Sequence, residues 1–303
     1  MYTQNVKKKK QAKKKHNFAL VFTLFIVAVA LFTLYTTLPF PSLQKVTKQE
    51  TITPSIPVSL TITPTPAPPT ATPTVTPEPL IGYCLRVPVI MYHHVQPMDE
   101  AKQKNQGGLS VDPGMFDHQM AYLTSAGYTT LFANELVHAL KNKAALPAKS
   151  ILVTFDDGYR DNHMYAFPII KKYGIKANLM LTTGLMEGAD YLTWDQVSDI
   201  KNSGLFYFTD HTWSHANVAA GTEEKIRYEI ETAKKQIQDK TGQVVDIFTY
   251  PYGASGPLAI KILQETGFTG AFTTIPGVYQ CDSFIFRLRR LRIGNSPLST
   301  YGL

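Results

Sequence analysis

The chain has 303 residues, enough for one large or two small domains, and its formal net charge at pH 7 is +7. Seven of its lysines lie between residues 7 and 15, with no acidic residue among them. Without these seven, the chain has 23 basic and 23 acidic residues. The remainder therefore has no net positive field for nucleic acid, and we expect no nucleic-acid partner. A basic nucleic-acid arm is the alternative interpretation of the lysines, and the segment that follows them argues against it.

Residues 18–38 are apolar apart from scattered threonines and Tyr35. A helix of this length is long enough to cross a bilayer. A cleavable signal peptide is the alternative, but residues 36–39 show no small-residue cleavage pattern. The lysines directly before this segment predict that residues 1–17 form a cytoplasmic tail. We therefore expect a single-pass anchor in the cell membrane, with everything after Leu38 outside the cell.

Residues 39–80 are rich in Pro and Thr and lack apolar periodicity, which predicts a disordered, extended linker. From residue 81 to residue 303 the sequence changes to short apolar runs that alternate with amphipathic segments, which predicts a folded domain. Cys84 and Cys281 are the only cysteines, and both fall in the part expected outside the cell. A disulfide between them is one interpretation and two free thiols are the other.

Apolar runs and helical spacing alternate regularly within residues 81–303. Strands are predicted at 87–92, 151–155, 177–182, 205–209, 244–249 and 270–274. Helices are predicted at 115–126, 134–140 with Asn134 as its cap, 161–173, 194–203, from 222 past 237, and 258–266. Strands separated by helices imply a parallel sheet, and seven or so such units suit an α/β fold with a distorted (β/α)7-type barrel. Chemistry in such barrels lies at the carboxyl ends of the strands.

Two short motifs lie at such strand ends. T-F-D-D-G-Y at 154–159 places Asp156 and Asp157 after one strand, and H-T-W-S-H at 211–215 places His211 and His215 after another. One Asp and two His form a three-ligand set for a divalent metal that leaves a position open for water. The second Asp can serve as a base, which completes the equipment for metal-assisted hydrolysis. Asp-Asp-Gly alone would indicate a surface turn, but together the two motifs indicate a metal site.

These motifs resemble those of the polysaccharide deacetylases of carbohydrate esterase family 4, which share the NodB homology domain. The resemblance runs from about residue 87 to residue 293 and is greatest to the branch that acts on exported poly-N-acetylglucosamine. It implies that Asp157, His211 and His215 bind the metal and that Asp156 is the general base. Zinc is the expected metal, and the same ligands would also accept Co, Ni or Fe.

The resemblance also implies groups that contact the substrate. The Y-P-Y-G segment contains Pro251 and Tyr252, and the backbone N–H of Tyr252 would stabilise the oxyanion. Tyr159 and Tyr252 are candidates for stacking on sugar rings. Trp194 and Trp213 could also stack on sugars, and burial in the core is the alternative for both.

The chain departs from the common family pattern in its proton donor. Many family members carry a His near the C-terminus that protonates the leaving amine, but this chain has no His after His215. In Y-H-H at 92–94, at the end of the first predicted strand, His93 matches the position of an acid in the exported-glucosaminan branch. We therefore assign His93 as the catalytic acid and keep His94 as the alternative.

Two further departures concern the neighbours of the metal site. Thr249 stands where common members carry an Arg that pairs with the base, so an Arg of the final strand is expected to orient Asp156. Arg290 fits the relatives' pattern best, and the other candidates are Arg287, Arg289 and Arg292. Asp210 replaces a small polar residue directly before the first His. It would bind a water, raise the pKa of a neighbouring carboxyl, or point away.

We therefore expect a membrane-anchored enzyme that hydrolyses N-acetyl groups of GlcNAc-containing cell-wall or extracellular polysaccharide and releases acetate. The departures motivate a second hypothesis, a glycan-binding module that has lost catalysis. A third is an esterase that removes O-acetyl groups from xylan-type glycans, because the same site can attack esters.

Overall fold

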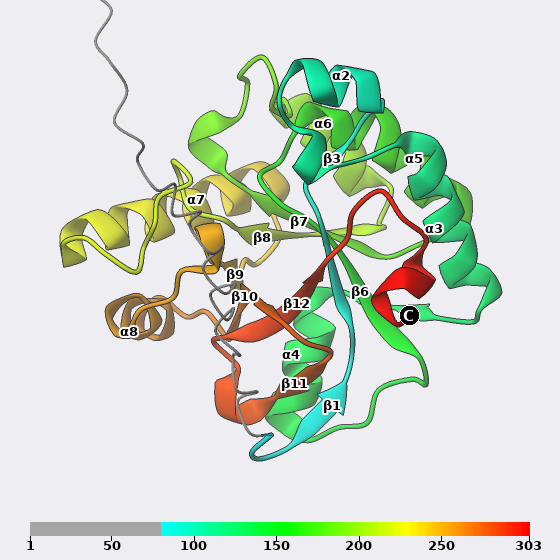
Figure 1. Cartoon of the computed structure of the whole chain (residues 1–303). Coiled ribbons are helices and arrows are strands. Elements are labelled where there is room, and N and C mark those ends of the chain that lie inside the picture. The colour runs from blue at the N-terminus through cyan, green and yellow to red at the C-terminus, as the bar shows by residue number, and fades with distance from the viewer. Residues whose placement is uncertain (1–79) are drawn as a thin grey trace, which may run out of the picture. The chain divides into compact units, whose positions relative to one another are not determined.

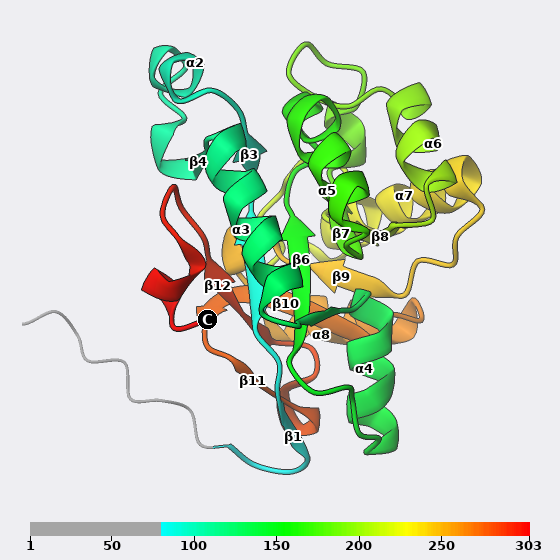
Figure 2. The same cartoon turned by 90° about the vertical axis from the view of Figure 1, so that its right-hand side faces the viewer.

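The computed structural model describes residues 80–303 (Figures 1 and 2), so the predicted tail, membrane segment and nearly all of the linker lie outside the described residues. Within residues 80–303, none of the helices is both long enough and apolar enough to span a bilayer. The predictions for residues 1–79 therefore stay predictions.

Seven parallel strands close into a barrel. Their bounds are β2 (Val89–Tyr92), β6 (Ser150–Phe155), β7 (Ala177–Leu181), β8 (Phe206–Asp210), β9 (Ile247–Thr249), β10 (Gly270–Pro276) and β12 (Leu288–Arg292). The strand order is β2-β12-β10-β9-β8-β7-β6, and β2 pairs again with β6, which closes the ring. The expected (β/α)7-type barrel is confirmed. Most strand residues are buried, as expected for parallel strands covered on both faces.

Helices surround the barrel on its outer side (Figures 1 and 2). They are α2 (Met98–Gln103), α3 (Pro113–Ser125), α4 (Ala133–Asn142), α5 (Phe167–Tyr173), α6 (Trp194–Asn202), α7 (Glu223–Thr241) and α8 (Pro257–Glu265). The short strands are β1 (Cys84–Arg86), β3 (His94–Val95), β4 (Ser110–Val111), β5 (Thr129–Thr130) and β11 (Tyr279–Cys281). Side chains of α7 that face the barrel, including Ile226, Ile230 and Ile237, are fully or almost fully buried, which agrees with the predicted apolar face.

One predicted helix start needs correction. Asn134 does not cap α4, because the helix already begins at Ala133 and the Glu135 carboxylate accepts a hydrogen bond from the Phe132 N–H at 2.6 Å. The helix predicted at 161–173 is confirmed, and it includes a wider π-helical turn at Asn162–Ala166 before α5. Such wide turns are frequent near functional sites.

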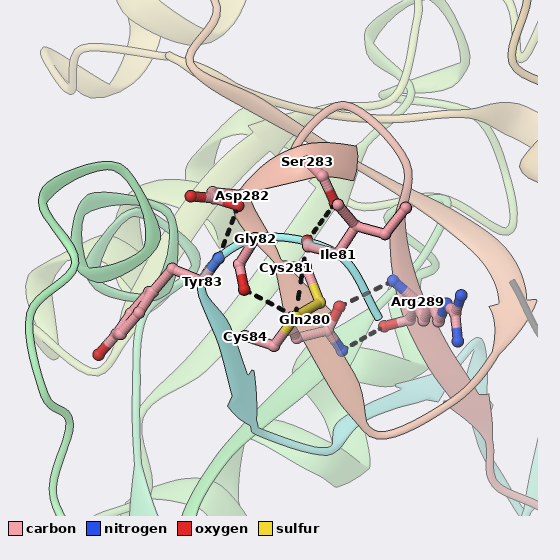
Figure 3. Close-up of a disulfide and its surroundings, with 9 residues drawn as sticks. All are labelled: Ile81, Gly82, Tyr83, Cys84, Gln280, Cys281, Asp282, Ser283 and Arg289. Carbon is pink, nitrogen blue, oxygen red and sulfur yellow. Dashed lines mark hydrogen bonds between the residues drawn. A yellow bond between two sulfur atoms is a disulfide. The ribbon is translucent and has the colours of Figure 1, made fainter. Parts of the chain in front are cut away.

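Cys84 and Cys281 form a disulfide, which decides between the two interpretations of the cysteines (Figure 3). It joins β1 to β11, which pair antiparallel with the two cysteines opposite each other. The Asp282 carboxylate accepts a hydrogen bond from the Tyr83 N–H at 2.9 Å in the same corner. Figure 2 shows β1 and β11 at the bottom of the view and the carboxyl end of β6 pointing upward. The disulfide therefore lies at the opposite end of the barrel from the Asp-Asp motif.

Candidate metal centre and its catalytic neighbours

Two histidines, His211 and His215, and one aspartate converge at the carboxyl end of the barrel. Asp157 follows β6, and His211 directly follows β8. The Nε2 atoms of His211 and His215 each lie 3.2 Å from Asp157 Oδ1. These three side chains offer ligand atoms that all lie within 4.8 Å of one another. Two imidazole nitrogens and one carboxylate oxygen in this arrangement fit a divalent cation of the zinc type.

Second partners orient both imidazole rings. His211 Nδ1 lies 2.7 Å from the carbonyl oxygen of Thr249. Because a carbonyl can only accept, Nδ1 must carry the proton, and the Nε2 lone pair is left for a metal. His215 Nδ1 lies 3.1 Å from the hydroxyl of Tyr252. Thr249, which stands where relatives carry an Arg, thus contributes its backbone to the site.

The Asp157 carboxylate is ionised in this environment. Burial alone would raise its pKa, but the close imidazoles of His211 and His215 hold the pKa well below its ordinary value. Asp157 also adopts a positive φ of 72°, which is unfavourable for a residue other than glycine. Strain of this kind persists where the surroundings fix the conformation, as at a functional site.

Asp156 points to a different partner. Its two oxygens accept hydrogen bonds from Arg290 Nη1 at 2.6 Å and Nη2 at 2.7 Å. Arg290 also donates from Nε to the Thr273 carbonyl at 2.8 Å and from Nη1 to Thr154 Oγ1 at 3.3 Å. Both side chains of the pair are almost fully buried, at 1% exposure for Arg290 and 2% for Asp156. Burial would raise the Asp156 pKa, but the charge and hydrogen bonds of Arg290 lower it.

Of the four arginines considered from the sequence, Arg290 is therefore the one whose guanidinium the structure places on Asp156. Arg292 is exposed and donates to the Gly108 carbonyl at 3.0 Å. The guanidinium of Arg289 lies over the ring of Phe284, 4.8 Å from its centroid.

His93 and His94 have different surroundings. Burial lowers the pKa of His93, and the negative charges of Asp156 and Asp157 oppose that shift, so His93 lies within electrostatic reach of both carboxylates. The His94 ring is only 2% exposed, and its Nδ1 lies 2.6 Å from an Asp161 carboxylate oxygen. The structure therefore brings His93 to the two carboxylates and ties His94 to Asp161.

The proposed substrate-contacting residues also lie near the metal ligands. Tyr252 is 67% exposed, has a positive φ of 61°, and belongs to a short 3-10 turn, η4 (Pro251–Gly253), in which Pro251 is buried. The ring of Tyr159 is stacked between His94 at 3.7 Å and Tyr191 at 5.2 Å between centroids. Burial, together with the negative charge of the neighbouring Asp157, raises the Tyr159 pKa, so its hydroxyl stays neutral.

Both tryptophans are partly buried. Trp213 packs edge-on against Tyr228, with 5.5 Å between ring centroids. Trp194 begins α6, and the Lys240 ammonium lies over its ring at 5.7 Å. These contacts within the protein explain the positions of both tryptophans without a role in sugar binding.

Asp210 does not point into solvent. It is fully buried, and its Oδ1 accepts a hydrogen bond from the Thr212 N–H at 2.7 Å. Burial raises its pKa well above the ordinary value. Its role in the structure is therefore to hold the first part of the turn between the two histidines.

Sequence reasoning missed three residues that contact the site: Asp161, Tyr191 and Glu229. For Asp161 and Tyr191 the sequence carries no signal. Glu229 had one, because it lies three residues after Ile226 on the apolar face of α7, where a charge is unexpected.

Comparisons with known proteins agree with the geometry. Residues 143–271 match the family model described as polysaccharide deacetylase. The protein YxkH of Bacillus subtilis (strain 168), by name a candidate polysaccharide deacetylase, is 29% identical over 208 residues, which cover 69% of this chain and 71% of that protein. The poly-beta-1,6-N-acetyl-D-glucosamine N-deacetylase of Escherichia coli (strain K12) is 25% identical over 69% of this chain, which spans only 36% of that relative.

A solved structure is similar over the same region. The Streptococcus pyogenes deacetylase PplD in complex with acetate superposes with a TM-score of 0.65 and 28% sequence identity. The match covers 69% of this chain and 92% of that chain.

Proposed function

We propose that the chain is a hydrolase of the polysaccharide deacetylase family. It removes N-acetyl groups from a GlcNAc-containing polymer in a metal-dependent reaction that releases acetate. One observation carries the proposal. Asp157, His211 and His215 converge on one point, and beside them the buried Arg290 holds Asp156 by both carboxylate oxygens.

The roles follow from these contacts. A divalent cation held by Asp157, His211 and His215 would supply Lewis acidity toward water and the acetamide carbonyl. Asp156 takes the proton of the attacking water, since Arg290 keeps it ionised and fixed in direction. We assign zinc as the metal, because one carboxylate and two imidazoles form a common zinc set.

The amine that leaves must be protonated, and His93 is the donor that we propose. It lies within electrostatic reach of both carboxylates, whereas His94 is committed to Asp161. Burial lowers the pKa of His93, so its imidazolium is a stronger acid than a free one. The backbone N–H of Tyr252 is the proposed second donor to the oxyanion, and the exposed Tyr252 ring and Tyr159 are the proposed contacts to the sugar.

We further propose that the polymer is of the poly-β-1,6-N-acetylglucosamine type and that the enzyme works outside the cell. The substrate class rests on the name of the Escherichia coli relative. The Cys84–Cys281 disulfide supports an oxidising compartment. The lysines and the apolar stretch at residues 18–38 support an anchor in the cell membrane with the amino terminus inside.

Acetate release by the purified full-length chain tests this proposal. The substrates are poly-β-1,6-N-acetylglucosamine oligomers, chito-oligosaccharides and acetylated xylan, each assayed with Zn²⁺, with Co²⁺ and with a chelator. We expect metal-dependent release from the first substrate, its loss in Asp157→Asn, and no loss in the exposed control Asp239→Asn. Release from acetylated xylan alone would identify an O-acetyl esterase, and sugar binding without release from any substrate would identify a glycan-binding module.

A further inference from the structure

The turn that separates the two metal-binding histidines is short and not helical. It runs from His211 to His215, and two of its residues have positive φ angles, 68° at Thr212 and 62° at His215. Neither residue is glycine, so each conformation is intrinsically unfavourable and needs support from its surroundings. The relative position of the two imidazoles depends on this support, because no regular hydrogen-bond ladder fixes the turn.

Helix α7 provides the support at the second half of the turn. The Glu229 carboxylate accepts a hydrogen bond from the Ser214 N–H at 2.7 Å through Oε2 and one from the Ser214 hydroxyl at 2.6 Å through Oε1. The backbone carbonyl of Glu229 also accepts from the Trp213 N–H at 3.0 Å. Glu229 is only 4% exposed, although carboxylates are rarely buried without a specific partner. Glu229 thus accepts three hydrogen bonds from Trp213 and Ser214, the two residues directly before His215.

The opposite side of the turn is held by the segment η3 (Thr183–Leu185). The Gly184 N–H donates to the Trp213 carbonyl at 2.6 Å, and the Thr183 N–H donates to the Thr212 carbonyl at 3.3 Å. A Cβ atom at Gly184 would lie 2.6 Å from that Trp213 oxygen and 2.7 Å from the indole ring. The turn is therefore clamped between η3 and α7, with little room to shift.

We propose that Glu229 is a positioning residue that sets the place of His215 relative to His211 and thereby the affinity and geometry of the metal site. This inference rests on the metal dependence of the proposed function. Outer partners of metal ligands commonly change metal affinity by about 10- to 100-fold when they are removed. Glu229 touches neither metal ligand, and its effect passes through the backbone of Trp213 and Ser214.

The chemistry of the contact separates geometry from charge. A glutamine at position 229 can accept from the Ser214 N–H with its oxygen and donate from its amide to the Ser214 hydroxyl, which can also accept. Glu229→Gln therefore keeps the hydrogen bonds and removes the charge. Glu229→Ala removes both.

The test uses the full-length chain loaded with Zn²⁺ or Co²⁺, with metal affinity measured by competition against a chromophoric chelator and coordination followed by the Co²⁺ absorption spectrum. We expect Glu229→Ala to weaken affinity at least about tenfold and to change the Co²⁺ spectrum. Glu229→Gln should restore most of the affinity, and Ser214→Ala, at an exposed position, should lose part of it. Glu231→Ala, an exposed residue of the same helix, is the control and should bind like the original chain.

Wild-type affinity and spectrum in Glu229→Ala would overturn the proposal, as would a Gln variant that loses as much as the Ala variant, since charge would then be the cause. If Glu229→Ala does not fold, the Gln and Ser214→Ala variants decide by the same two readouts. Failure of the unmodified chain to bind either metal would instead refute the proposed metal-dependent function itself.

Discussion

The buried ion pair of Asp156 and Arg290 offers the sharpest test of the site. Replacement of Arg290 by methionine keeps much of the side-chain length and removes the guanidinium. Asp156, 2% exposed, then loses both of its hydrogen bonds to Arg290, at 2.6 Å and 2.7 Å. Removal of one partner from a buried pair destabilises proteins by about 3–5 kcal/mol, because an uncompensated charge stays buried. We expect Arg290→Met to lower the free energy of unfolding by about that amount at pH 7.

The pH dependence of this loss follows from the direction of the pKa shift. In the original protein the Asp156 pKa is lowered, so the pair contributes stability above the unfolded pKa, near 3.8, and loses it as pH falls through the folded pKa. In Arg290→Met burial is no longer opposed by the guanidinium, so the Asp156 pKa rises above its unfolded value. The variant then loses stability as pH rises from about 4, near the unfolded pKa, toward 7. The difference between the two proteins should therefore be largest near neutral pH, smaller near pH 4, and smallest below the folded pKa of Asp156.

Urea unfolding measures this difference, with a chelator present so that no bound cation contributes. Arg292→Met, an exposed position in the same strand, is the matched control and should cost less than about 1 kcal/mol. The double variant Asp156→Asn/Arg290→Met should be less destabilised than the sum of its single changes. Equal unfolding free energies for Arg290→Met and Arg292→Met at pH 7 would refute the reasoning.

Three further outcomes are expected. His93→Ala should lower the rate of N-deacetylation about 10²- to 10⁴-fold and keep metal binding. It should retain hydrolysis of an activated aryl acetate, because that leaving group needs no proton, and equal loss on both substrates would argue against an acid role. His138→Ala, at an exposed position, serves as the control. A chelator should abolish acetate release and Zn²⁺ or Co²⁺ should restore it, but not in His211→Ala; activity that survives metal removal would contradict a metal reaction. Cys84→Ser/Cys281→Ser should lower the free energy of unfolding by about 2–5 kcal/mol, because the disulfide closes a long loop. Turnover at low temperature should stay nearly unchanged, because the disulfide lies at the other end of the barrel from the site. Unchanged stability in thermal and urea unfolding would refute this.

Most of the barrel could be predicted because its strands are buried on both faces and therefore form continuous apolar runs such as Ile151–Val153. The exceptions have physical reasons. The strands β1, β3, β4, β5 and β11 have two or three residues each, too few for a period to show. The last barrel strand reads Leu-Arg-Arg-Leu-Arg, which resembles a surface segment, yet Arg290 turns into the barrel and is neutralised there by Asp156.

The candidate metal ligands could be predicted from the sequence because each motif is short and continuous, with Asp157 after one strand and the histidines after another. The groups that hold these side chains in place could not be predicted, because they lie on other helices and strands. Glu229 reaches the turn from α7, and the Thr249 carbonyl reaches His211 from β9. A backbone carbonyl has no sequence signature, and a single buried glutamate becomes informative only when its partner is known.

The order of the strands in the barrel divides the site into two parts with different dependence on folding. Asp157 follows β6 and His211 follows β8. Both strands pair with β7, which lies between them in the sequence as well as in the sheet. β2 lies between β6 and β12, so Arg290 reaches Asp156 only when the first and last barrel strands meet, whereas His93 follows β2, which pairs directly with β6. Catalysis therefore depends on closure of the barrel at the seam between β2 and β12, whereas the metal ligands depend on the β6–β8 side.

This division predicts that catalysis is lost before metal binding as the protein is destabilised. In a urea titration of the cobalt-loaded chain, we expect acetate release to fall at a lower urea concentration than the Co²⁺ absorption bands. Hydrogen exchange under the same conditions should show that the backbone amides of β12 open before those of β7. If turnover and the Co²⁺ bands disappear in one transition, the seam does not open separately. The two halves of the site would then be held by a single cooperative unit.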